Sequence, residues 1–168
     1  MIKFSCEKVF LQNAIAVTSR AVAQKSSIPA LEGLLIHADQ QLTISGYNMQ
    51  TGIRTNVFAN VVEGGDIVLN ARLFGDIIRR MPDDMITFTA DEKMMVHVSC
   101  GDADFDILGL SAADYPDLPE VEDEYAVSMQ QKVLRSMIEE VAFAVSTNES
   151  RPVHTLSLIH ISEPTRPY

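Results

Sequence analysis

The chain has few cysteines, no long apolar run and no recognisable secretion signal. Cys6 and Cys100 are its two cysteines, which is too few for a disulfide scaffold and compatible with a reducing cytosol. No stretch approaches the ~18 consecutive apolar residues that a membrane-spanning helix needs. The first residues, MIKFSCEK, lack the apolar segment of a signal peptide. We therefore expect a cytoplasmic protein without a membrane segment. Apolar residues make up 46% of the 168 positions, enough to bury a core.

Basic residues are outnumbered by acidic ones, 13 against 23, which gives a formal net charge of −10. On composition alone, this argues against a protein that reads DNA sequence in a groove. The charges are segregated, however. The stretches 8–25 and 72–80 each hold three bases and at most one acid, whereas 102–124 holds nine acids and no base. This pattern suits a solvated acidic surface, and equally a protein whose helices face an anion while its outside repels it.

The periodicity of apolar residues predicts an α+β domain built from hairpins. Helices are expected over 9–22 and 71–81, because apolar side chains recur there at helical spacing and Pro29 and Pro82 follow. Strands are expected over 2–7, 31–38, 41–47, 52–62, 66–69, 85–89, 94–99 and 105–110. Together they predict an antiparallel sheet with two amphipathic helices on one face.

A second strand and helix, expected over 124–130 and 131–145, repeat the first pair at a spacing of 123 residues. The spacing pairs Leu11 with Leu134 and Pro29 with Pro152. It also pairs Ser5, Ile15, Ala21, Val22 and Ser27 with Ser128, Ile138, Ala144, Val145 and Ser150. We infer a duplication, so the chain holds one complete repeat and the start of a second. The expected organisation is a first domain over 1–118, a linker over 119–124 and the truncated start of a second domain over 125–155.

Six segments carry a family resemblance: MIKFSCEKVFLQNAI, SSIPALEGLLI, QLTISGYNMQTGI, ARLFGDIIRRMP, LSAADYPDLP and FAVSTNESRPV. In these segments the chain resembles the bacterial β sliding clamp, the β subunit of DNA polymerase III, and the similarity extends over residues 1–155. That family is built from three such repeats per chain, and two chains form a ring around duplex DNA. The duplication is therefore what the resemblance implies.

The resemblance implies the DNA-clamp fold and the role of a processivity factor, which tethers the replicative polymerase to DNA. It implies no catalytic activity and no cofactor. The implied partners are double-stranded DNA, a second copy of the chain in a head-to-tail ring dimer, the DNA polymerase III α subunit and the clamp loader. A ring that slides needs diffuse positive potential on its inner wall instead of base-specific contacts.

By the resemblance, the DNA-contacting positions fall on Lys25, Arg72 and Asn148. Without the resemblance, the preferred interpretation of Lys25 is a solvated residue that stabilises a helix C-terminus. Further inner-wall charge is expected from Lys8, Arg20, Arg79, Arg80, Lys132 and Arg135. The dimer surface maps to the helix around Leu73 and the strand around Phe105 and Ile107, although the pattern of the strand is equally that of a core face.

Residues 156–168, LSLIHISEPTRPY, depart from the family pattern. The family continues with glycine after the position of Thr155, whereas this string resembles the translation of a sequencing adapter. We expect the segment to be non-native and the chain to be a truncated clamp. Most of the peptide-binding cleft for the polymerase and the loader would then be missing.

A small hydrolase or a scaffold without DNA binding are the alternatives. His97, Cys100 and Asp102 lie within six residues, but on a strand His97 and Cys100 point to opposite faces. The spacing of acids after residue 101 does not fit a calcium loop, because Ile107 and Ala113 occupy the glycine and glutamate positions.

The remaining motif searches also indicate neither metal nor cofactor. His37, His97 and His154 are widely spaced and match no zinc pattern. No GxxxxGK[ST] or GxGxxG phosphate-binding motif is present. We therefore expect a protein without a metal site.

Overall fold

The computed structural model describes residues 1–119, 126–146, 150 and 152–156. The chain divides into two units, Met1–Pro119 and Glu120–Tyr168, and each is described by itself. The first unit has two α-helices, α1 (Lys8–Thr18) and α2 (Ala71–Arg80), and three 3-10 turns, η1 (Ser19–Ala21), η2 (Pro29–Glu32) and η3 (Ala112–Asp114). Its strands are β1 (Ile2–Glu7), β2 (Gly33–Ala38), β3 (Leu42–Tyr47), β4 (Gly52–Val57), β5 (Asn60–Glu63), β6 (Gly65–Asn70), β7 (Met85–Ala90), β8 (Met95–Cys100) and β9 (Ala103–Leu108).

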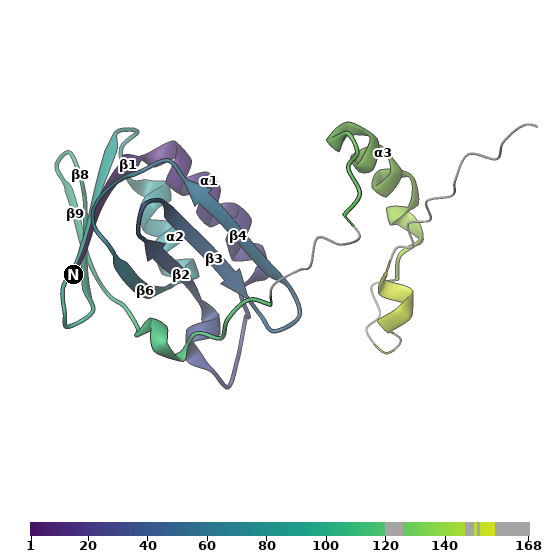
Figure 1. Cartoon of the computed structure of the whole chain (residues 1–168), viewed down its shortest axis with the longest axis horizontal. Helices are drawn as coiled ribbons and strands as arrows, with labels where there is room; N and C mark the ends of the chain where they lie inside the picture. The colour runs from purple at the N-terminus through teal and green to yellow at the C-terminus, as the bar shows by residue number, and fades with distance from the viewer. Residues whose placement is uncertain (120–125, 147–149, 151, 157–168) are drawn as a thin grey trace, which may run out of the picture. The chain divides into compact units, whose positions relative to one another are not determined.

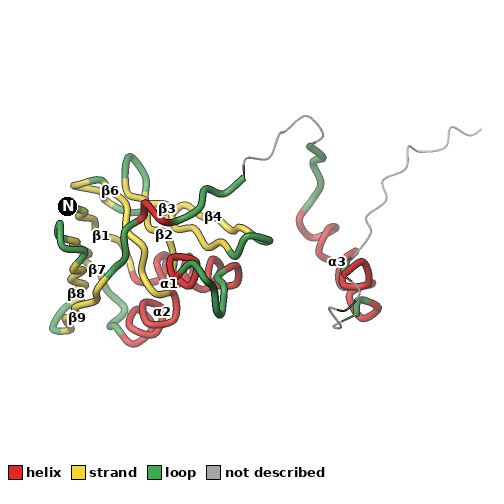
Figure 2. Tube along the Cα trace, turned by 90° about the horizontal axis from the view of Figure 1, so that it is seen from below, coloured by secondary structure: helices red, strands yellow, loops and turns green. Residues whose placement is uncertain are grey.

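These strands form two antiparallel sheets instead of the single sheet expected from the sequence. One has the order β5-β1-β7-β8-β9 and the other β4-β3-β2-β6 (Figure 1). The two helices lie on the same side of the four-stranded sheet (Figure 2). The α+β prediction with two helices on one face is therefore confirmed, and the division into two sheets is the new element.

The stretch 52–62, expected as one strand, is two strands that belong to different sheets. β4 pairs with β3, whereas β5 pairs with β1. The chain crosses between the sheets at Phe58 and Ala59, where the Phe58 ring is 82% exposed and meets Phe10 edge-on at 5.8 Å. The alternation of apolar and polar residues along 52–62 cannot reveal this crossing, because the pairing of backbones decides which sheet a strand joins.

Both helices bury an apolar stripe in a core shared with both sheets. On α1 the stripe includes Leu11 and Ile15, and on α2 it includes Phe74 and Ile78. Asn70 begins α2, because its side-chain Oδ1 accepts a hydrogen bond from the Leu73 amide at 3.0 Å. Pro82 follows the end of the helix and cannot continue it.

Two boundaries differ from the sequence prediction because a 3-10 turn replaces regular structure. The first helix ends at Thr18 and continues as η1, and the first residues of the expected strand 31–38 form η2. Pro29 begins η2, where its fixed φ suits the first helical position.

β3 passes very close to the end of α1. A Cβ at Gly46 would lie 2.2 Å from the Thr18 carbonyl oxygen. Only glycine allows this approach of backbone to backbone.

The second unit contains α3 (Gln131–Val141), η5 (Ala142–Ala144) and η6 (Pro152–Thr155). Each is displaced by 123 residues from α1, η1 and η2, so the repeat is present in the structure as well as in the sequence. Ile138 of α3 is 45% exposed, whereas its equivalent Ile15 is 4% exposed in the core. The expected strand 124–130 is not formed over its described residues, 126–130. Most of the expected linker and the tail after Leu156 lie outside the described residues.

Candidate nucleic-acid interface

A polar groove of about 720 Å³ lies between α1 and α2. From α2 it is lined by Arg72, Asp76 and Arg79, and from α1 and η1 by Gln12 and Ser19. The lining also includes Gln24, Glu32 and Asn70. The two helices therefore present hydrogen-bond donors and positive charge on one surface, a composition suited to a phosphate backbone.

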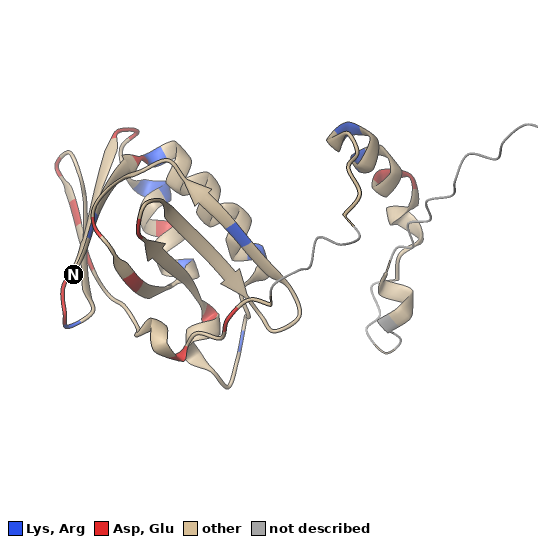
Figure 3. Ribbon diagram, in the orientation of Figure 1, with Lys and Arg blue, Asp and Glu red and all other residues tan. Residues whose placement is uncertain are grey.

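The helices concentrate the positive charge of the first unit. Together α1, η1 and α2 carry Lys8, Arg20, Arg72, Arg79 and Arg80 against the single acid Asp76. Figure 3 shows blue segments on both helices, and red segments mainly on strands and turns.

Not all of these bases are free. Arg79 Nη2 lies 3.1 Å from Asp76 Oδ1, one turn earlier on the same helix. Arg20, Arg72 and Arg80 are exposed and form no ion pair within residues 1–119. The exposed bases thus give a diffuse positive surface.

Lys25 lies in the loop between η1 and η2 and is exposed, without an ion pair in residues 1–119. Its equivalent under the repeat, Asn148, lies outside the described residues. On α3, Lys132 and Arg135 are exposed, and Arg135 Nε donates to Glu139 Oε1 at 2.8 Å. Both residues belong to the second unit.

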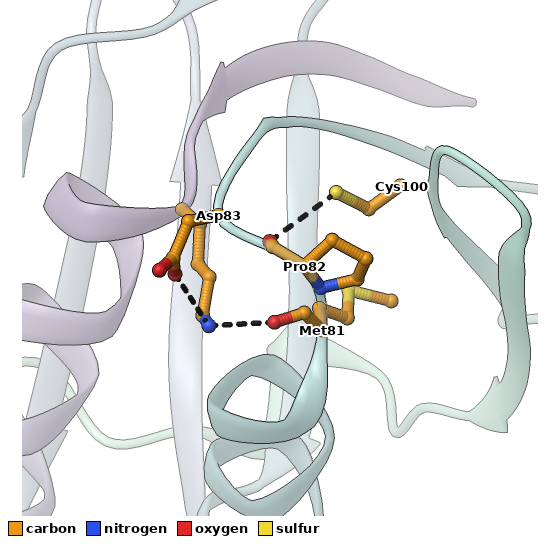
Figure 4. A network of polar contacts seen from close by, with 5 residues as sticks. Met81, Pro82, Asp83 and Cys100 are labelled. Carbon is orange, nitrogen blue, oxygen red and sulfur yellow. Dashed lines mark hydrogen bonds and ion pairs between the residues drawn. The ribbon is translucent and has the colours of Figure 1, made fainter.

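Lys8 does not belong among the inner-wall charges. Its side chain is 9% exposed, and Nζ donates to the Met81 carbonyl at 2.6 Å and lies 2.7 Å from Asp83 Oδ1 (Figure 4). Lys8 is the first residue of α1, and its stem crosses to the last turn of α2, where the carbonyl lacks a partner within its helix. The ammonium therefore joins the two helices and does not face a ligand.

One of the three residues expected on the dimer surface is buried in the structure. Leu73 and Phe105 are 49% and 39% exposed, but Ile107 is 4% exposed and part of the core. β9 pairs with β8 on one side, and its other edge has no strand partner within residues 1–119. Ile107 faces inward because it lies opposite the buried Val96 in that pairing.

The residues considered for a hydrolase are not brought together. His97 is exposed on β8, whereas the buried Cys100 directs Sγ towards the Pro82 carbonyl at 3.5 Å (Figure 4). The carboxylate of Asp106 accepts a hydrogen bond from His97 Nδ1 at 2.9 Å and thereby raises the pKa of His97, and the nearby charges of Asp106 and Asp104 act in the same direction. The prediction that His97 and Cys100 point to opposite faces is confirmed.

Two further groups have shifted pKa values because they are buried in the core. Burial raises the pKa of the Cys6 thiol to about 12 and that of the Tyr115 hydroxyl to about 12. Both are therefore protonated at neutral pH. In the described part of the chain, no three His, Cys, Asp or Glu side chains are grouped so as to hold a metal ion. Among the same residues, no helix is long and apolar enough to cross a membrane.

The sequence prediction missed the uncharged lining of the groove. Gln12, Ala16 and Ser19 follow one another at spacings of four and three on α1 and η1, the spacing of one helix face. That pattern was visible in the sequence. Gln24, in the loop after η1, and the acidic Glu32, at the end of η2, also line the groove and carried no such signal.

The first unit matches a known protein family. The family model for the N-terminal domain of the DNA polymerase III beta subunit matches residues 2–119. The chain belongs to this family. The resemblance noted in the sequence is thereby confirmed, and the beta-subunit domain coincides with the unit that contains the groove.

Curated relatives of this beta-subunit chain are beta sliding clamps. The one from Lactococcus lactis subsp. lactis (strain IL1403) is 34% identical over 163 residues, which cover 92% of this chain and 43% of the relative. The one from Bacillus subtilis (strain 168) is 28% identical, with the same coverage of 92% and 43%. The chain therefore spans less than half the length of these relatives.

Solved beta-subunit structures have the same fold. A putative DNA polymerase III beta subunit from Eubacterium rectale ATCC 33656 superposes with a TM-score of 0.86 at 29% identity, over 92% of this chain and 42% of that one. The beta subunit of the DNA polymerase of Streptococcus pyogenes gives 0.83 at 32% identity, over 90% and 42%. The prediction of the DNA-clamp fold is confirmed.

Proposed function

We propose that the chain acts as part of a sliding clamp, a non-catalytic ring that encircles duplex DNA and tethers the replicative polymerase. In this proposal residues 1–118 form the first clamp domain, 119–124 the linker and 125–155 the start of the second domain. The partners are double-stranded DNA, a second copy of the full-length protein, the DNA polymerase III α subunit and the clamp loader.

The observation that carries the proposal is the distribution of charge in a chain with net charge −10. Three of the exposed bases without an ion pair within residues 1–119, Arg20, Arg72 and Arg80, lie on η1 and α2 of the first unit, whereas Lys3 and Arg54 lie on β1 and β4. The acids are mainly on strands and turns (Figure 3). A surface of this kind attracts phosphates without reading bases, while the remaining surface repels them.

Within the groove we assign Arg72 to phosphate contact, with Lys25 on the adjoining loop and Asn148 as its equivalent in the second repeat. Arg20, Arg79, Arg80, Lys132 and Arg135 add to the positive potential of the inner wall. Leu73 and Phe105, which are exposed, are assigned to the contact with a second copy, together with the open edge of β9.

Retention on circular DNA tests the proposed ring. The full-length protein is loaded onto nicked circular duplex DNA, and the bound protein is measured before and after the circle is cut. Topological binding predicts retention on the circle and loss from the linear product. Loss from both forms, or equal retention on both, would overturn the proposal and favour a scaffold that does not encircle DNA.

The salt dependence of DNA binding tests the assigned residues. The logarithm of the affinity falls linearly with the logarithm of the salt concentration. Each phosphate contact removed should make this dependence less steep by about 0.9. We therefore expect this decrease for Lys25→Ala and for Arg72→Ala. Lys93→Ala, in the exposed turn between β7 and β8, removes the same charge away from the groove and should leave the slope unchanged. If all three variants have the slope of the unmodified protein, Lys25 and Arg72 do not contact phosphates.

A further inference from the structure

The loop from Val22 to Ile28 connects η1 with η2 and carries Lys25. At its base the Ala23 amide donates to the Leu31 carbonyl at 3.0 Å. Closer to the tip, the Ser26 amide donates to Glu32 Oε1 at 3.1 Å. At the end of the loop, the Ile28 amide donates to Ser26 Oγ at 3.1 Å, and the Ile28 carbonyl accepts from the Leu31 amide at 3.1 Å. Glu32 thus supplies the contact that ties the tip of the loop to the body of the domain.

Glu32 has an unusual position for a carboxylate. It is half-buried, lines the groove between α1 and α2, and forms no ion pair within residues 1–119. In a groove that binds phosphates, its charge opposes binding. Its carboxylate accepts a hydrogen bond from the amide of Ser26, the residue that directly follows Lys25.

We propose that Glu32 is a positioning residue for Lys25. Its carboxylate holds the Ser26 amide and so fixes the backbone next to Lys25 in one conformation before DNA arrives. The physical reason is preorganisation, because ordering a loop during binding costs conformational entropy that a loop already ordered does not lose. The inference rests on the proposed DNA-binding role of Lys25, and it assigns Glu32 a part in that same site.

Two substitutions separate the positioning effect from the charge effect. Glu32→Gln and Glu32→Ala both remove the negative charge, but only glutamine retains a side-chain oxygen that can accept from the Ser26 amide. A charge effect alone predicts equal DNA affinity for the two variants. The positioning role predicts that Glu32→Ala binds about two- to tenfold more weakly than Glu32→Gln, the range of one intramolecular hydrogen bond.

The experiment measures the affinity of the full-length protein for duplex DNA in four variants. They are Glu32→Gln and Glu32→Ala, each with Lys25 present and each combined with Lys25→Ala. We expect the difference between glutamine and alanine to disappear when Lys25 is absent, because the loop then has no ammonium to position. Equal affinities with Lys25 present, or a difference that persists without it, would overturn the inference.

The outcome also distinguishes this inference from the proposed function. If Lys25→Ala and Arg72→Ala both bind DNA as the unmodified protein does, the assigned interface fails before Glu32 is considered. If they weaken binding while the two Glu32 variants agree, only the positioning role fails.

The 168-residue chain allows a direct check of the hydrogen bond. Exchange of the Ser26 amide with solvent, measured by NMR, should be faster in Glu32→Ala than in Glu32→Gln. Amides of β1 and β7 serve as the internal control, because they should exchange equally in both variants if the fold is intact. Equal protection of Ser26 in both variants would contradict the proposed tether.

Discussion

Replacement of Lys8 by methionine should destabilise the first unit, because the ammonium of Lys8 joins the start of α1 to the end of α2. Nζ donates to the Met81 carbonyl at 2.6 Å from a side chain that is 9% exposed. Methionine retains an apolar stem of similar length but cannot donate. The substitution therefore removes the bond with little change in packing.

The expected loss is that of one buried hydrogen bond from a charged donor, about 1.5–3 kcal/mol. The ion pair to Asp83 contributes less, because the Asp83 carboxylate is 82% exposed and its interaction is screened by solvent. Asp83→Asn is the matched control, and we expect it to cost about 0–1 kcal/mol. The larger loss therefore belongs to the contact with the Met81 carbonyl.

Urea unfolding followed by far-UV circular dichroism measures both free energies in the 168-residue chain. We expect Lys8→Met to lower the free energy of unfolding by about 0.5–3 kcal/mol more than Asp83→Asn does, the difference between the two ranges above. Equal losses would show that the exposed ion pair carries the interaction. No loss in Lys8→Met would refute the reasoning from burial.

Three further predictions concern titration, thiol reactivity and packing. Because the pKa of His97 is raised in the folded chain, its protonation stabilises the fold fully at pH values below the ordinary pKa of 6.5. This contribution is lost as the pH rises through the pKa of the folded state. An NMR titration should show a lower pKa of His97 in Asp106→Asn than in the unmodified chain. The Cys6 thiol, with a pKa raised to about 12 by burial, should not react with Ellman's reagent at pH near 8 until the chain unfolds. Gly46→Ala should cost at least about 2 kcal/mol in urea unfolding, since its Cβ would lie 2.2 Å from the Thr18 carbonyl oxygen.

Each of these predictions has a result that contradicts it. An unchanged His97 titration in Asp106→Asn would assign the shift to another group. Labelling of Cys6 in the folded chain would mean that the thiol is accessible there. Gly101→Ala is the packing control, because Gly101 has φ of 59° but open space around its Cβ position. It should show backbone strain alone, about 1–2 kcal/mol, and a Gly46→Ala loss below that of Gly101→Ala would argue against the close approach.

The sequence predicted the helices well because each carries its own signals. Apolar side chains recur at helical spacing on α1 and α2, and Pro82 follows α2 closely, whereas α1 ends at Thr18, well before Pro29. The repeat was equally visible, since the spacing of 123 residues that aligns Leu11 with Leu134 also relates α1 to α3 and η1 to η5. Helical periodicity and an internal repeat are both patterns of the sequence itself, so they can be read without knowing the fold.

The candidate functional residues were predicted less completely. The exposed Arg72 and Lys25 came from the family resemblance, and their exposure agrees with a contact role. Glu32 was missed, because its relation to Lys25 is a hydrogen bond to the amide of Ser26 and not a pattern of residue types. Side-chain acceptors for loop amides leave no periodic trace in a sequence.

By itself, the sequence determined the two helices and most strands of the first unit, the repeat at a spacing of 123 residues and the sign of the charge on each segment. The tertiary structure alone decided that the stretch 52–62 serves two sheets, that Lys8 is enclosed between two helix ends, and that Ile107 faces the core. The physical reason is the same in all three cases. Pairing partners, burial and the satisfaction of carbonyl groups depend on residues far away in the chain, such as Lys8 and Met81, and no local pattern records which distant group will be near.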